Sequence, residues 1–104
     1  MLYIVYCKDY PEQSARIRSQ FLSEHLAYLD KHQDIILLGG AMLAEDGKTR
    51  LGSTLVLNVP SRDQAVQFSQ NEPFRCAGLY ESVEITRMRR GQWYPANVPP
   101  SADG

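Results

Sequence analysis

Two side chains that can exchange protons, His25 and Glu72, lie far apart in the sequence. An imidazole takes up and releases a proton near neutral pH, and a carboxylate beside it can orient the ring. The two residues therefore predict general acid–base chemistry, provided that the fold brings them together. Each also has a purely structural interpretation: His25 as a packed histidine bordering the apolar face of a helix, and Glu72 as an acid favoured near a helix start.

Two further side chains are candidates for contacts to a substrate. Arg18 lies two turns before His25 on the same helical stripe, where its guanidinium either holds an anionic ligand or forms a surface ion pair. Ser53 lies in an apolar run without the Gly-x-Ser-x-Gly pattern of a nucleophile elbow, so we expect a hydrogen bond to a ligand rather than nucleophilic attack. His32 is expected to cap carbonyl groups at a helix end.

The sequence indicates neither a metal site nor a cofactor. Cys7 and Cys76 lack metal-ligand spacing and have apolar neighbours, which favours small buried thiols in a reducing cytoplasm over a disulfide. No cluster of His, Cys, Asp and Glu has the spacing of a metal site. The paired glycines Gly39-Gly40 show no phosphate-loop pattern and instead suggest a bulge or a close approach to the backbone.

Size and charge limit the classes of function. The chain has 104 residues, enough for one domain with a single core. Its net charge of -1 and the lack of a basic stripe give no footprint for nucleic acid. No apolar run approaches membrane-spanning length, and no secretion signal is recognised at the N-terminus. We therefore expect a cytoplasmic protein whose partner is a small molecule.

The pattern of apolar residues predicts four strands and two main helices. The strands are expected over residues 2–7, 34–43, 49–59 and 80–89. One long helix is expected from Glu12 to about His32, capped by Asp9, because apolar residues recur there at spacings of three to four. A second helix is expected to begin at Pro60-Ser61.

A short helical turn is expected around Glu72, between the second helix and the last strand. Asn71 is predicted to cap this turn, and Pro73 suits its first position. Gly78 is predicted to end the turn with a positive φ. Glu72 is therefore expected on a segment that is locally fixed.

The element order β-α-β-β-α-β predicts a ferredoxin-like α+β fold, with an antiparallel four-stranded sheet and both helices on one face. The other face would stay bare although it carries large apolar side chains, and such a patch usually marks an interface. We therefore expect a homodimer that packs two sheets face to face. Residues 91–104 are expected to form an irregular C-terminal tail.

Several short motifs follow one another along the chain: Arg18 and His25-Leu26-Ala27-Tyr28-Leu29, Leu38-Gly39-Gly40-Ala41, Asp46-Gly47, Gly52-Ser53, and Glu72-Pro73-Phe74 with Gly78-Leu79. In this order and spacing they resemble the YCII family of YciI-like proteins. The resemblance covers residues 1–90, which we take as the domain. It implies a dimeric α+β barrel built from ferredoxin-like subunits.

The resemblance also implies a pocket with a helix histidine and an aspartate from an Asp-Pro-Phe motif. The histidine corresponds to His25, and the aspartate to position 72, which is glutamate in this chain. Glutamate keeps the carboxylic acid of the family's aspartate, but its side chain is longer. The family's glycine-serine pair corresponds to Gly52 and Ser53, as pocket lining.

Our leading hypothesis is a cofactor-free enzyme of the lyase or isomerase type that moves protons on a small, anionic organic substrate. In it His25 is the acid–base, Glu72 its orienting partner, and Arg18 and Ser53 are substrate contacts. The first alternative is a non-catalytic protein that binds a small ligand in the same pocket. The second is a cofactor-free monooxygenase of the same barrel fold, which no motif of this chain supports.

Overall fold

The structure, a computed structural model, describes residues 1–104 and contains one antiparallel sheet with the strand order β2-β3-β1-β4. The strands are β1 (Leu2–Asp9), β2 (Ile36–Leu43), β3 (Arg50–Asn58) and β4 (Tyr80–Met88). The helices are α1 (Pro11–Gln20), α2 (Leu22–Lys31), α3 (Arg62–Gln70) and α4 (Pro73–Cys76), followed by the 3-10 turn η1 (Pro95–Asn97). This order confirms the predicted ferredoxin-like α+β fold.

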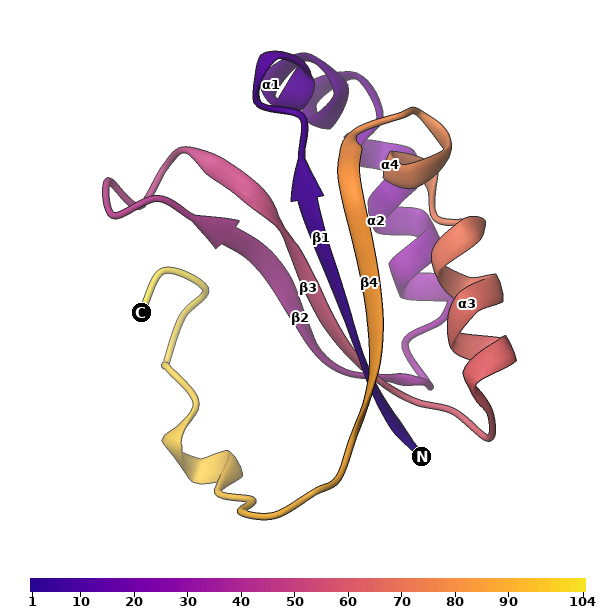
Figure 1. Cartoon of the computed structure of the whole chain (residues 1–104). Helices are drawn as coiled ribbons and strands as arrows, with labels where there is room; N and C mark the ends of the chain where they lie inside the picture. Colours follow the sequence, from indigo (N-terminus) through magenta and orange to yellow (C-terminus); the bar gives the residue numbers. More distant parts are fainter.

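The prediction of one long helix is wrong, because the helix divides at Phe21 into α1 and α2. Phe21 has φ −109° and ψ 14°, outside the helical region, although its N–H still reaches the carbonyl of Ile17 at 2.9 Å. The apolar spacing continues through this break, so the periodicity alone did not reveal it. The break lets α1 lie across the end of the sheet while α2 runs along it (Figure 1).

The predicted cap of this helix is also wrong. Tyr10 occupies the N-cap position of α1 without a side-chain hydrogen bond, and Asp9 is the last residue of β1. The Asp9 carboxylate instead accepts hydrogen bonds from the side chains of Ser14 and Arg18. By contrast, Ser61 caps α3 as expected, accepting the N–H of Gln64 at 3.3 Å.

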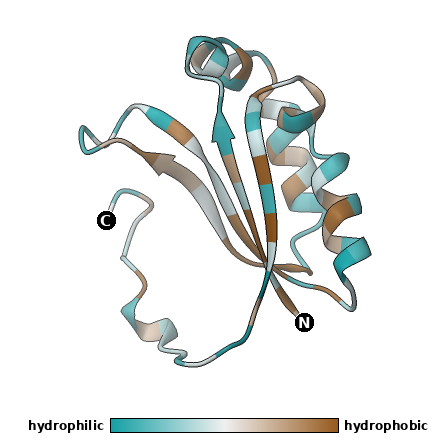
Figure 2. Ribbon diagram, viewed as in Figure 1, coloured by the Kyte–Doolittle hydropathy of each residue, from teal (hydrophilic) through white to brown (hydrophobic).

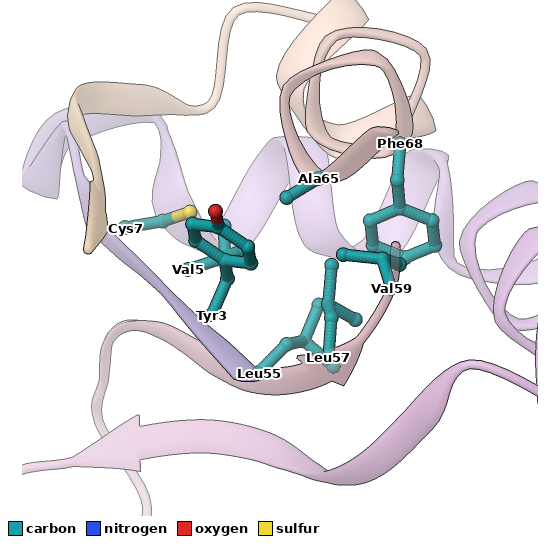
Figure 3. Close-up of a cluster of buried hydrophobic side chains, with 8 residues drawn as sticks. All are labelled: Tyr3, Val5, Cys7, Leu55, Leu57, Val59, Ala65 and Phe68. Atoms are coloured by element: carbon teal, nitrogen blue, oxygen red, sulfur yellow. The ribbon is translucent and has the colours of Figure 1, made fainter. Parts of the chain in front are cut away.

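Helices α2, α3 and α4 lie together on one side of the sheet (Figure 1). The core forms between them and the sheet, where alternate residues of β1 and β3 meet side chains of α3 (Figure 3). Its buried members are Tyr3, Val5, Cys7, Leu55, Leu57, Val59, Ala65 and Phe68. A smaller buried cluster of Ile17, Phe74 and Leu79 joins α1 to α4 and the start of β4.

The opposite face of the sheet carries no helix. Brown and teal segments alternate along β4 in Figure 2, as expected of a strand with two different faces. The register places Ile4 beside Val56, and Val56 beside Leu38, on the face without helices. Leu38 is 64% exposed and Met88 at the end of β4 is 41% exposed. This open face therefore carries exposed apolar side chains beside polar ones such as Lys8 and Glu84.

Gly39 lies where the sequence suggested a close approach to the backbone, and a tight turn follows between β2 and β3. A Cβ on Gly39 would lie 2.1 Å from Cδ2 of Leu55, so this position lets a core side chain approach β2 closely. Asp46 closes the turn between β2 and β3, and its hydrogen bonds to the Thr49 hydroxyl and to the backbone N–H groups of Thr49 and Lys48 lower its pKa to about 2.

Candidate active site

The fold brings His25 of α2 and Glu72 together although 47 residues separate them. Nδ1 of His25 forms a hydrogen bond with Oε1 of Glu72, and the two side chains are only 13% and 5% exposed. A carboxylate has no proton to donate, so Nδ1 carries the proton when Glu72 is ionised. The imidazole is therefore held in one orientation by a buried acid.

Glu72 is itself fixed by the short helix that follows it. It is the N-cap of α4, where Oε2 accepts the backbone N–H of Arg75 at 3.2 Å. Asn71, predicted to be this cap, instead ends α3 and donates its side-chain amide to the carbonyl of Gln67. Gly78 has φ 82° and ends the turn as predicted. One oxygen of Glu72 thus caps the helix while the other holds His25.

An aromatic ring supports the imidazole from one side. The rings of His25 and Phe74 are stacked, with centroids 3.9 Å apart and planes inclined by 13°. Nε2 of His25 has no hydrogen-bond partner in the chain, and no fully buried side-chain nitrogen or oxygen lacks one. Nε2 is therefore accessible to solvent or a ligand. This is the atom that a general base needs to have free.

Arg18 is the centre of a second polar group beside this one. Its Nε and Nη2 donate to the two oxygens of Asp9 at 2.8 and 3.1 Å. Nη2 also contacts the carbonyl of Gly52 at 2.9 Å and Oγ of Ser53 at 3.0 Å. Its guanidinium carbon lies 5.3 Å from the centre of the Phe74 ring, and Nη1 has no partner in the chain. Arg18 thus joins α1 to β1 and β3 and keeps both N–H bonds of Nη1 free.

Ser53 is shared between this group and Tyr80. The Tyr80 hydroxyl lies 3.2 Å from Oγ of Ser53, and this oxygen also accepts a hydrogen bond from Nη2 of Arg18. Burial, followed by the negative charge of Glu72, raises the pKa of Tyr80, so its hydroxyl stays protonated at physiological pH. Ser53 is 8% exposed and makes no contact that would activate it as a nucleophile.

Two concave regions meet at these side chains. The inner cavity has a volume of about 40 Å³, and its polar lining comes from His25, Ser53, Ser69, Glu72 and Tyr80. The outer hollow, of about 530 Å³, is lined by residues that include Arg18, Leu22, Leu26, Arg50 and Phe74. His25 and Ser53 line both regions, so a molecule in the outer hollow meets both.

The two cysteines differ in their surroundings. Cys7 lines the inner cavity, and burial, followed by the charge of Glu72, raises the pKa of its thiol to about 12. It is therefore a packing residue and not a nucleophile. Cys76 is exposed, contrary to the prediction that both thiols are buried, because α4 is a single turn with one face in solvent.

Three residues of this region were not recognised in the sequence as site residues. Asp9 was interpreted as a helix cap, Phe74 as part of a motif, and Tyr80 as the start of a strand. A register shift between Lys8 and Asp9 pairs Asp9 with Tyr80 across β1 and β4. No local sequence signal announces that shift.

No helix of the structure is long and apolar enough to cross a membrane.

The fold and this arrangement define a small α+β protein with a histidine–carboxylate pair beside a cavity. The chain belongs to the YCII-related family, since the YCII-related domain matches residues 1–89. It is similar to the solved structure of 5-chloro-2-hydroxyhydroquinone dehydrochlorinase (TftG) from Burkholderia phenoliruptrix AC1100, in complex with 2,5-dihydroxybenzoquinone. The two are 33% identical with a TM-score of 0.79, over 88% of this chain and 96% of that chain. No curated protein matches the chain.

Proposed function

We propose that this protein is a lyase-type enzyme that works by acid–base catalysis without a cofactor. The observation that carries the proposal is the His25–Glu72 pair, in which Nδ1 is bound by a buried carboxylate and Nε2 is free. An imidazole held in this way accepts a proton at one nitrogen, while the carboxylate stabilises the charge that forms. Glu72 takes the role that the resemblance gives to aspartate.

The reaction that suits this equipment is an elimination. Nε2 of His25 removes a proton from the substrate, the electron pair released forms a new double bond, and a leaving group such as chloride departs with its bonding electrons. The similar structure is that of a dehydrochlorinase, whose reaction is of this type. That enzyme acts on a small hydroxylated ring and binds another, so we extend this substrate class to the present chain.

Arg18 and Ser53 are proposed to contact this substrate. Arg18 faces the outer hollow, and its free Nη1 can donate to an anionic group there. Ser53 lines both concave regions beside His25. A substrate in the outer hollow would thus meet a cation and a hydroxyl at the same edge as the base.

Turnover tests this proposal directly. The purified protein is incubated without oxygen with 5-chloro-2-hydroxyhydroquinone, and free chloride is measured against a protein-free control. Release of one chloride per substrate, faster than in the control, supports the lyase. Binding of this compound without chloride release would favour the non-catalytic protein instead. Oxygen consumption on admitting air, again in excess of the control, would favour a monooxygenase.

We also propose that the protein acts as a homodimer in the cytoplasm. The open face carries apolar side chains of β1, β2 and β3, among them Ile4, Val56 and Leu38, and a second copy packed on it would remove them from water. Both cysteines are free thiols, which suits a reducing compartment. Sedimentation at micromolar concentration should give twice the chain mass. A stable monomer would contradict the packing of one open face on another.

A further inference from the structure

The hydroxyl groups of Ser53 and Tyr80 have one proton more than the chain can accept. Arg18 has only N–H donors, so Ser53 must accept at the 3.0 Å contact with Nη2. The two hydroxyls share a single hydrogen bond of 3.2 Å, and neither has an acceptor elsewhere in the chain. Whichever hydroxyl donates within the pair, the other keeps a proton with no acceptor.

The hydroxyl that keeps this proton lines the inner cavity. Ser53 and Tyr80 both line that cavity, together with His25 and Glu72. The rest of the lining is largely apolar, including Val5, Leu29, Leu55 and Phe68, so few other groups compete for a ligand's oxygen. The cavity thus presents the donor of the Ser53–Tyr80 pair beside the imidazole of His25, with the hydroxyl of Ser69 as a further polar group.

We propose that the Ser53–Tyr80 pair donates this hydrogen bond to a phenolate or enolate oxygen of the substrate. The inference rests on the proposed function, in which His25 removes a proton. When Nε2 takes that proton, the electron pair left behind is delocalised onto the substrate oxygen, which becomes an anion and accepts the hydrogen bond. No covalent bond to the protein forms. The substrate class is therefore a small planar molecule with a ring hydroxyl or a carbonyl conjugated to the reacting carbon.

The surroundings orient this donor and keep it protonated. The positive charge of Arg18 polarises Ser53 through their direct contact, and Asp9 balances this charge from the opposite side. The raised pKa of Tyr80 keeps its proton in place. Because Arg18 is held by Asp9, Gly52 and Ser53, the donor is oriented before a substrate arrives. Arg18 thus acts here as a positioning residue as well as a contact.

Binding of 2,5-dihydroxybenzoquinone, measured by titration calorimetry, tests the inference. This probe carries acidic ring hydroxyls, and the similar TftG structure holds it. We expect Tyr80→Phe and Ser53→Ala each to weaken binding less than about 2-fold, because the remaining hydroxyl still has a proton without an acceptor in the chain. The double variant should bind about 10-fold more weakly than the wild type, since the hydrogen bond to a charged group is then lost.

Tyr28→Phe is the matched control. Its hydroxyl donates to the carbonyl of Phe68 and does not line the inner cavity, so binding should stay unchanged. Equal binding by the wild type and the double variant would overturn the inference, and so would failure of the wild type to bind the probe. A loss in the double variant no larger than the two single losses combined would show two independent donors and also contradict it. Weakened binding without chloride release would keep the donor and refute only the lyase.

Discussion

The helix-covered side of the sheet has two ends that differ in chemistry. The apolar end consists of Tyr3, Leu57, Val59, Ala65 and Phe68, all no more than 5% exposed. The polar end consists of Asp9, Arg18, His25, Ser53 and Glu72, joined by hydrogen bonds and ion pairs. Buried ion pairs stabilise a fold little compared with well-packed apolar residues. The apolar end therefore accounts for stability, whereas the polar end suits the acid–base chemistry that we propose.

The two histidines show the same contrast on a single helix. His25 gives Nδ1 to the buried carboxylate of Glu72 and has Nε2 free at a cavity. His32, which ends α2, gives Nδ1 to the carbonyl of Tyr28 in its own helix and packs against Tyr28 and Phe68. A neutral carbonyl cannot stabilise an imidazolium as a carboxylate does. Only His25 is therefore equipped as a base.

The largest expected effect is on turnover in His25→Gln. Losing the base should lower kcat about 10³-fold, within the range for general acid–base catalysis. The free energy of unfolding should change by only about 1 kcal/mol, as for most point variants. His32→Gln is the control and should keep the wild-type rate. Chloride release and chemical unfolding measure the two quantities. Equal rates for His25→Gln and His32→Gln would show that the polar end does not supply the catalytic base.

The opposite behaviour is expected of Leu57→Ala at the apolar end. Truncating this fully buried side chain should lower the free energy of unfolding by about 3 kcal/mol. The kcat of the remaining folded protein should change less than threefold, because the polar end is held by other contacts. Urea unfolding and active-site titration separate the two effects. A rate loss as large as that of His25→Gln would show that the two ends are coupled.

Arg18→Met should lower the free energy of unfolding. The Asp9 side chain is 1% exposed, and removing its partner leaves a buried charge uncompensated, which costs about 3 kcal/mol of stability. Adding Asp9→Asn to this variant should recover part of the loss, because the unpaired charge is then gone. The comparison of single and double variants by urea unfolding measures this recovery. A double variant as unstable as the sum of both changes would mean that Asp9 and Arg18 act independently.

The smallest effect concerns thiol reactivity. With its pKa raised to about 12 by burial, Cys7 has almost no thiolate at neutral pH, whereas Cys76 is exposed. A thiol reagent at neutral pH should therefore label one cysteine per native chain and two after unfolding. In Cys76→Ala, labelling of the native chain should be negligible and should rise only as the pH approaches 12. Rapid labelling of that variant near pH 8 would show that the inner cavity opens readily.

The sequence predicted the fold because its strands and helices have clear apolar periods. Pro73 and Gly78 also predicted a fixed turn around Glu72, whereas the pairing of Glu72 with His25 was suggested by their residue types and by the resemblance to the YCII family. The polar end as a whole was not predictable in this way. It depends on the helix break at Phe21 and on the pairing of Asp9 with Tyr80, and both are set by tertiary packing.

The position of the proton on the His25 ring shows whether Glu72 orients the imidazole. In the wild type, ring-nitrogen NMR above the titration range of histidine should show the proton on Nδ1 of both His25 and His32. In Glu72→Gln, the amide oxygen is needed to cap α4 at the N–H of Arg75, so the amide NH₂ should face His25. The His25 proton is then predicted to move to Nε2, while His32 stays unchanged. An identical His25 tautomer in both proteins would contradict the proposal that Glu72 orients the base.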